Sequence, residues 1–155
     1  MTALATIKTF PIPPNDLCFD QIRLRFVRVV PGNVTRGLLP FYHFRILTAD
    51  DKDVGHINFR FGDTEHVRLY AGHIGFEINE AFRGRRLAFQ ACRAIAPFIR
   101  SFYTTVIITS DPDNLACVRT IERLGATFVD EVIVPPHDPQ YQRGSRRKKR
   151  YHWRP

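Results

Sequence analysis

The sequence has no long apolar run, little cysteine and no repeat. Its longest hydrophobic stretches fall far short of the ~20 residues that a membrane span needs, so we expect no membrane helix. The segment 1–10 is of mixed character and is followed by prolines, which is unlike a secretion signal. Cys18, Cys92 and Cys117 are widely spaced and form no C-x-x-C pair, which argues against a disulfide framework and favours a reducing, cytoplasmic location.

Several motifs of nucleotide and metal sites are also missing. There is no G-x-x-x-x-G-K-[ST], no G-x-G-x-x-G and no H-E-x-x-H, which excludes the P-loop, the dinucleotide fingerprint and the common zinc helix. His56, His66 and His73 lie on different segments or at spacings that suit no metal. We therefore expect no metal site.

What is present fits one globular domain with a basic charge balance. The 155 residues are 44% hydrophobic and 25% charged, so we expect a single domain over 1–155. We divide it into an arm at 1–20, a core at 54–134, and a loop with a basic last strand at 135–155. The 23 Lys and Arg residues outnumber the 15 Asp and Glu residues and give a net charge of +8, which indicates an anionic partner.

Hydrophobic periodicity predicts the order of the elements. Alternation with a period of two predicts strands over 21–30, 41–48, 54–61 and 67–79, and a loop with at most a short helical turn over 31–40. Helical spacing then predicts a helix over 86–100 that Pro97 ends or kinks, before a β-branched strand over 104–109 that is buried on both faces. Ser110 or Asp111 is expected to cap a second helix with Pro112 at its first position, Gly125 ends it, and strands follow at 126–134 and 147–153. The fold class is α+β: a mixed, mostly antiparallel sheet of about seven strands, with a meander followed by a βαβ unit.

The segment 80–88 joins a predicted strand to the first long helix. Free N–H groups at a helix start bind phosphate without any particular side chain. Arg83, Arg85 and Arg86 lie at the same end, where cations oppose the helix dipole unless an anion is bound. The segment therefore indicates a phosphate ligand, with a solvated basic loop as the alternative.

These features resemble the GNAT acetyltransferase superfamily, whose pyrophosphate loop reads [Q/R]-x-x-G-x-[G/A]. Arg83 and Ala88 match the ends of that pattern, while Arg86 replaces its central glycine. The stretch 113–126 is similar to the family's N-x-x-[A/S]…L-G-[F/A] helix, and 72–79 is similar to the strand before the loop. The resemblance covers 54–134.

The resemblance implies acetyl-coenzyme A, or another acyl-coenzyme A, as the cofactor. Its pantetheine would lie in a splay between 72–79 and 104–110, and its pyrophosphate on the N–H groups of 84–88. The expected cofactor-binding residues are Ile78, Asn79, Arg83, Gly84, Arg85, Arg86, Leu87, Ala88, Asn114 and Cys117. Because the sequence gives no histidine and acid pair that can be assigned to Cys117, we interpret this cysteine as a small packing residue rather than a nucleophile.

The reaction that the resemblance implies is direct acyl transfer to a primary amine, so we expect an enzyme. Glu77 and His73 share the polar face of the strand that leads to the cofactor, and either could be the base, directly or through water. The alternatives are a surface carboxylate for Glu77 and a hydrogen-bonded core histidine for His73. Many family members carry a tyrosine as the acid where this chain has Ile121, so the thiolate would leave unaided or through water.

The resemblance implies an acceptor site shaped by two helices between the first two strands. Only about ten residues separate these strands in this chain, so the acceptor site must be built differently. We expect residues 1–20, a homodimer mate, or the loop 135–145 with His137 and Tyr141 to build it, and we take Tyr141 as the substrate-binding candidate. The acceptor itself, a small molecule or a protein amine, stays open.

Two other functions stay open. The basic run 143–154 with Tyr151 and Trp153 could contact RNA or a ribosome without catalysis, although a solvated strand edge would also explain it. The chain could also bind acyl-coenzyme A only as a signal.

Overall fold

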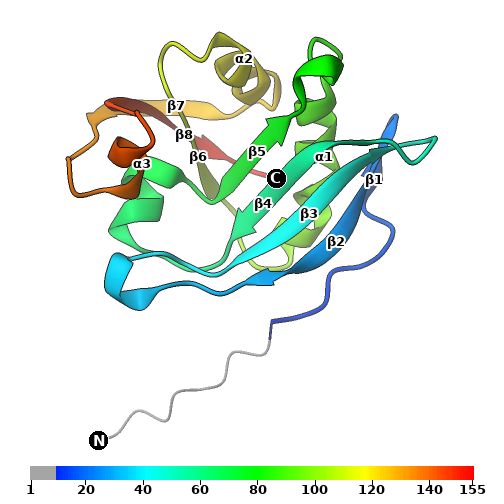
Figure 1. The fold of residues 1–155 in the computed structure, drawn as a ribbon, viewed down its shortest axis with the longest axis horizontal. Helices are drawn as coiled ribbons and strands as arrows, with labels where there is room; N and C mark the ends of the chain where they lie inside the picture. Colours follow the sequence, from blue (N-terminus) through cyan, green and yellow to red (C-terminus); the bar gives the residue numbers. More distant parts are fainter. Residues whose placement is uncertain (1–9) are drawn as a thin grey trace, which may run out of the picture.

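The chain, described here by a computed structural model over residues 10–155, forms an α+β fold with two antiparallel sheets (Figure 1). The larger sheet holds β1 (Cys18–Phe19), β2 (Ile22–Val30), β3 (Phe41–Thr48), β4 (Asp53–Arg60) and β5 (Ile74–Ile78) in sequence order. The smaller sheet has the order β6 (Val106–Ser110), β8 (Arg147–Trp153), β7 (Thr127–Ile133). The helices are α1 (Leu87–Arg100), α2 (Leu115–Arg123) and the short α3 (Pro139–Gln142). Of the expected arm, residues 1–9 lie outside the described residues.

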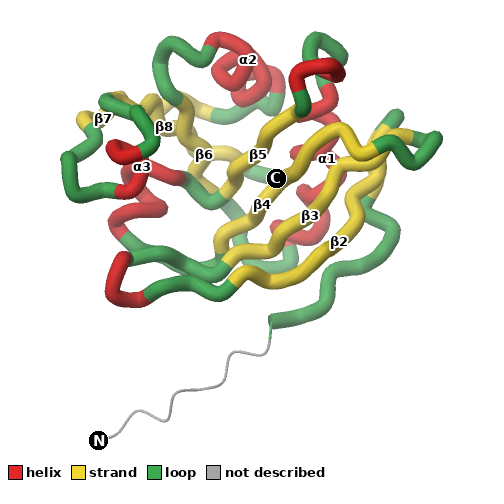
Figure 2. The backbone as a smooth tube through the Cα atoms, in the orientation of Figure 1, coloured by secondary structure: helices red, strands yellow, loops and turns green. Residues whose placement is uncertain are grey.

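The meander and the β5–α1–β6 unit confirm the predicted topology. Tyr42, Phe44 and Phe59 alternate on the strand faces toward α1 and are fully buried. Helix α1 covers them with Ile95 and Phe98, and Figure 2 shows it behind the large sheet. Phe98 meets the Tyr42 ring edge-on at 4.9 Å, so its truncation to alanine should cost about 3–5 kcal/mol. This core fixes the start of α1 relative to the end of β5.

The long strand expected over 67–79 is wrong in its first half. A π-helical turn occupies His66–Ala71, and the strand β5 begins only at Ile74. Val67, Tyr70 and Ala71 are buried. Residues three and four positions apart share one face of a helix, whereas a strand would bury every second residue, so this pattern suits a helical turn better than a strand. Gly72 then reverses the chain with a φ of 70°, close against the backbone of β6.

Helix α1 has its predicted extent and runs to Arg100 with Pro97 inside it, whereas the start of α2 differs from the prediction. Helix α2 is capped by Asn114, not by Ser110 or Asp111, because the Asp111 carboxylate is already paired with Lys148 at 2.7 Å and accepts from Ser145 Oγ at 2.8 Å.

The basic run near the C-terminus forms β8, which is the central strand of the small sheet rather than an edge. Three of its four cations are paired: Arg147 with Glu131, Lys148 with Asp111 and Arg150 with Asp130. The side chains of Tyr151 and Trp153 are buried in the core, so these two aromatic residues are not available for the RNA contact that was left open for the basic run. The charge run is needed here to balance the acids of β7 and of the β6–α2 turn.

The two sheets meet where β5 and β6 begin. The His73 N–H donates to the Ile107 carbonyl oxygen at 2.7 Å, and beyond this point each strand pairs only within its own sheet. The strands therefore part after one point of contact, as the resemblance implies. Among residues 10–155, none of the helices has the length and apolar character that crossing a membrane requires.

Candidate functional site

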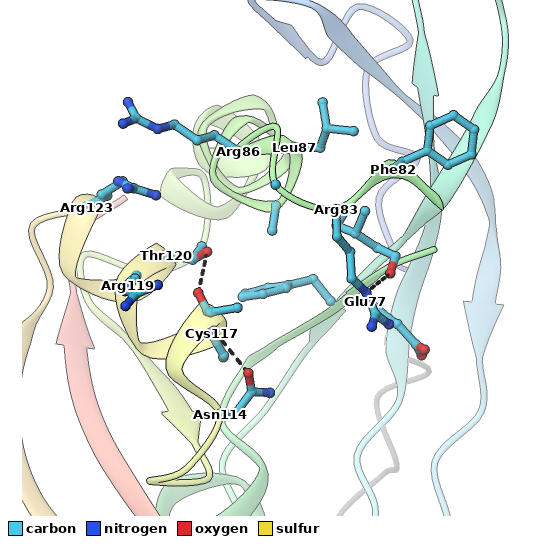
Figure 3. Close-up of a pocket in the computed structure, with 15 residues that line it drawn as sticks. Glu77, Phe82, Arg83, Arg86, Leu87, Asn114, Cys117, Arg119, Thr120 and Arg123 are labelled. Atoms are coloured by element: carbon cyan, nitrogen blue, oxygen red, sulfur yellow. Dashed lines mark hydrogen bonds between the residues drawn. The ribbon is translucent and has the colours of Figure 1, made fainter. Parts of the chain in front are cut away.

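A cleft of about 600 Å³ opens beyond the end of β5, between the loop into α1 and the first turns of α2 (Figure 3). It brings together three segments that are separate in the sequence. The lining residues are Phe76, Glu77 and Ile78 of β5, Phe82, Arg83, Gly84, Arg86, Leu87 and Ala88 of the loop and α1, and Asn114, Ala116, Cys117, Arg119, Thr120 and Arg123 of α2. Eight of the ten expected cofactor-binding residues are among them.

The start of α1 faces this cleft without a side-chain cap. The first helical hydrogen bond runs from the Gln90 N–H to the Arg86 carbonyl oxygen at 3.1 Å, so the N–H groups of the three preceding residues have no partner within the helix. Gly84 adopts a φ of 84° and has open space around it. An uncapped helix start beside an open, left-handed turn is suited to bind an anion.

Arg86 is the residue at which this chain departs from the loop pattern of the family, which has a glycine there. Its φ of 58° is left-handed, a conformation that glycine adopts without strain and that other residues rarely adopt. The position therefore keeps the backbone shape for which the family uses glycine, and adds a guanidinium at the cleft.

Four arginines and one carboxylate line the cleft. Arg86 from the loop gathers with Arg119 and Arg123 of α2 on one side, and Arg83 lies across from them (Figure 3). Sequence reasoning missed the α2 pair, although two arginines four residues apart on an amphipathic helix were a usable signal. Arg85 is not among the lining residues, and its guanidinium lies 5.8 Å from the centroid of the Phe82 ring.

The backbone groups expected to bind the pantetheine already have partners. The Ile78 carbonyl oxygen accepts from Arg83 Nε at 2.9 Å, and the Asn79 N–H donates to Val54 at 2.8 Å. Ile78 lines the cleft, while Asn79 does not. A ligand that pairs with the Ile78 carbonyl oxygen would share it with the exposed Arg83 side chain or displace that side chain.

On α2, Asn114 and Cys117 both line the cleft, as expected. The Asn114 side-chain oxygen accepts from the Cys117 N–H at 3.2 Å and caps the helix, so its amide nitrogen is left for a ligand. Burial raises the pKa of the Cys117 thiol, which keeps it protonated. This agrees with a packing residue rather than a nucleophile.

The two base candidates have different surroundings. Glu77 lies at the cleft and is exposed, and it faces His56 across β4 and β5. His73 is buried, its Nε2 donates to the Gly62 carbonyl oxygen at 3.1 Å, and its Nδ1 accepts from the Ile107 N–H at 3.1 Å. Both nitrogens of His73 are occupied and it does not line the cleft, so its geometry is that of a structural histidine.

Tyr141, the expected acceptor residue, lies in α3 with the Arg146 guanidinium 3.6 Å from its ring centroid. It lines neither the cleft described above nor a second cavity beside α3. Its neighbours Pro139, Gln140, Gln142 and Arg143 do line that second cavity, so the loop 135–145 contributes to it through other side chains.

Solved structures with a similar fold are acetyltransferases. RimL, a ribosomal L7/L12 alpha-N-protein acetyltransferase, gives a TM-score of 0.56 at 17% identity over 74% of this chain and 69% of that one. MccE, a microcin C7 self-immunity acetyltransferase solved with acetyl-CoA and AMP, gives 0.55 at 18% identity over 74% and 61%. A GNAT-family acetyltransferase from Bacillus anthracis gives 0.52 at 22% identity over 72% and 63%. The matched region spans about two thirds or less of these chains, and the identities establish the fold alone.

A comparison with curated proteins gives no match. The family model of the acetyltransferase (GNAT) domain, in contrast, matches residues 12–127, which is most of the chain and includes the splayed strands, the cleft loop and α2. The chain belongs to the GNAT acetyltransferase family.

Proposed function

We propose that this protein transfers an acetyl group from acetyl-coenzyme A to a primary amine by direct attack while both substrates are bound. The family establishes acyl-coenzyme A as the donor class. The observation that supports the proposal here is the cleft itself, because it joins an uncapped helix start, four guanidinium groups and the C-terminal half of β5, the strand that parts from β6. Those residues fit a polyanionic ligand with a long uncharged arm.

The residues of the cleft divide the work of binding. The free N–H groups at the start of α1 bind the diphosphate, and Arg86, Arg119 and Arg123 neutralise its charge. The amide nitrogen of Asn114 faces the pantetheine arm. The bound cofactor supplies a thioester, whose carbonyl carbon is the electrophile.

Glu77 is the proposed base. The amine nitrogen forms a bond to the thioester carbonyl carbon, the bond between that carbon and sulfur breaks, and the thiolate leaves. Glu77 first takes one proton from the amine, directly or through water, because an amine is mostly protonated at neutral pH and cannot attack in that form. The nitrogen loses its second proton to water after it is bonded to the carbonyl carbon. The buried Ile121 offers no acid, so the thiolate takes its proton from water.

Binding and turnover test this proposal separately. Acetyl-coenzyme A at about a hundredfold its Kd should add roughly 2.7 kcal/mol to the free energy of unfolding. A free-thiol assay with a panel of amines should show release of coenzyme A that depends on the amine. Failure of millimolar acetyl-coenzyme A to stabilise the protein would refute the cofactor assignment, whereas stabilisation without amine-dependent release would favour a protein that only senses the cofactor.

A further inference from the structure

A second cavity of about 360 Å³ lies between the loop before β3, the end of β4 and α3. Its lining carries three guanidinium groups, from Arg36, Arg60 and Arg143, beside the His66 imidazole and the amides of Gln140 and Gln142. No Asp or Glu residue of the described chain is among its lining residues. The cavity is therefore electropositive and has no use in the binding of the cofactor described above.

Arg60 is a largely buried cation of this cavity that has no counter-ion among residues 10–155. Its guanidinium donates to the Gly72 carbonyl oxygen at 3.2 Å and, at 3.5 Å, to that of Ala71. In residues 10–155 no carboxylate lies within ion-pair distance of it. Burial removes water from the Arg60 guanidinium and, together with the nearby charge of Arg143, lowers its pKa to about 10. The group is therefore still charged at neutral pH. An anion in the cavity would offset this cost.

Asp138, which pairs with the cavity residue His66, already has other partners. The buried Asp138 accepts from the Gln140 N–H at 2.8 Å and pairs with His66 Nδ1 at 2.7 Å. Its carboxylate is therefore used to hold α3 and the π-helical turn together, and it does not serve as the counter-ion of Arg60.

Arg60 also lies next to the place where the sheets part. Its own N–H donates to the His73 carbonyl oxygen at 2.7 Å. A Cβ atom built on Gly75 would lie 3.4 Å from its guanidinium, and the following residue, Phe76, lines the cofactor cleft. The guanidinium thus lies over the start of β5, where the two sheets meet.

We propose that this second cavity binds the acceptor, and that the acceptor is a small amine that also carries a carboxylate. This rests on the proposed function. Arg60 and Arg143 hold the carboxylate, since a planar guanidinium can donate two parallel hydrogen bonds to it. The volume of about 360 Å³ lies at the lower end of the ~300–1,000 Å³ typical of ligand pockets, which favours a small molecule over a peptide.

Matched pairs of amines test the proposal. Each ω-amino acid from glycine to 5-aminopentanoate is compared with the n-alkylamine of the same chain length, and kcat/KM is measured for each. For at least one pair we expect a preference of ~10-fold or more for the carboxylate member. Arg60→Gln should remove that preference by lowering kcat/KM for the amino acid alone, and Arg143→Gln, at an exposed position where folding is not at risk, should reduce it. Arg100→Gln on the far end of α1 makes the same charge change outside both cavities and should change nothing.

Three results would overturn the proposal: equal kcat/KM for both members of every pair, an equal loss for both members in Arg60→Gln, or acetylation of a peptide N-terminus only. If no amine is turned over, calorimetric titration of 4-aminobutyrate into the enzyme with coenzyme A decides. Binding that Arg60→Gln abolishes supports the proposal, and no binding at millimolar concentration overturns it. The Kd for acetyl-coenzyme A is measured in the same samples, so a failure of the cofactor site is distinguished from a failure of the acceptor site.

Discussion

The imidazole of His73 accepts from the N–H of Ile107 at 3.1 Å, while the N–H of His73 donates to the carbonyl oxygen of Ile107 at 2.7 Å. This reciprocal pair joins the two sheets at the starts of β5 and β6. Because Nδ1 accepts, the proton of the neutral ring is on Nε2, which donates to Gly62. His73 therefore holds the two strands together at the point from which they part, and its neutral form is the one that makes both hydrogen bonds.

The first prediction concerns the pH dependence of stability. Burial lowers the pKa of His73, so below about pH 6.5 the unfolded chain binds a proton that the folded chain does not. The contribution of the neutral ring to the free energy of unfolding is therefore complete above about pH 6.5 and falls as the pH drops toward the pKa of His73 in the folded chain. We expect His73→Gln to lower the free energy of unfolding by roughly 1–3 kcal/mol at neutral pH and to reduce the further loss on acidification. Urea unfolding at about pH 7.5 and about pH 5.5 measures both.

A control separates this effect from general acid sensitivity. His152 is exposed on β8, and His152→Gln should leave the acid-induced loss as it is in the unmodified protein. If His73→Gln loses as much stability on acidification as the unmodified protein does, the ring does not couple to pH in the way described.

The second prediction concerns the backbone at Arg86. At its φ of 58°, Arg86→Ala should be less stable than Arg86→Gly by roughly 1 kcal/mol, because alanine is strained there and glycine is not. Arg85 lies outside the positive-φ region, so the same pair of substitutions at Arg85 should reverse the order. Chemical unfolding of the four variants checks this. The same order at both positions would show that the left-handed conformation is not the cause.

The third prediction concerns the two arginines of α2. Arg119→Gln and Arg123→Gln should each weaken acetyl-coenzyme A binding about 3- to 10-fold, since each removes a charge that faces the phosphates. The double variant should also show a smaller loss of affinity with added salt, because fewer screened ion pairs remain. Titration calorimetry at two salt concentrations measures this, with Arg100→Gln as the control. An unchanged Kd in the double variant would place the phosphates elsewhere.

The fourth prediction uses the three free thiols as internal reporters. Cys18 is exposed, Cys92 is buried and Cys117 lines the cleft. With iodoacetamide, Cys18 should react first and Cys117 more slowly, because burial raises the pKa of its thiol. Acetyl-coenzyme A should slow the labelling of Cys117 and leave that of Cys18 unchanged, as peptide mass spectrometry can show. Equal protection of both thiols would indicate global tightening rather than occupation of the cleft.

The fifth prediction concerns Glu77 as the base. Because the side chain is exposed and makes no ion pair among residues 10–155, Glu77→Gln should leave the free energy of unfolding and the Kd for acetyl-coenzyme A nearly unchanged. Its kcat should fall by ~100-fold, with partial recovery at high pH, where the free amine needs no base. A kcat within about twofold of the unmodified enzyme at neutral pH would remove Glu77 from the mechanism.

Elements with a strong local signal were predictable from the sequence. The apolar stripe of α1, the β-branched run of β6 and the alternation in β2 to β4 each follow from a period that one face of the core imposes. The loop that begins at Arg83 was recognisable for the same kind of reason, because backbone amides at a helix start bind phosphate through local geometry. The family resemblance was carried by these segments and is confirmed by the family match.

Only the tertiary structure decided the rest, since those features depend on which distant segments come together. His66 and Asp138 are 72 residues apart and form one buried pair, which no local pattern in either segment predicts. The basic run of β8 reads as a solvated edge until its partners on β7 and Asp111 are known. Arg60 is an ordinary strand residue in the sequence, and its uncompensated charge exists only because folding removes water from it while bringing carbonyl groups, and no carboxylate, into contact.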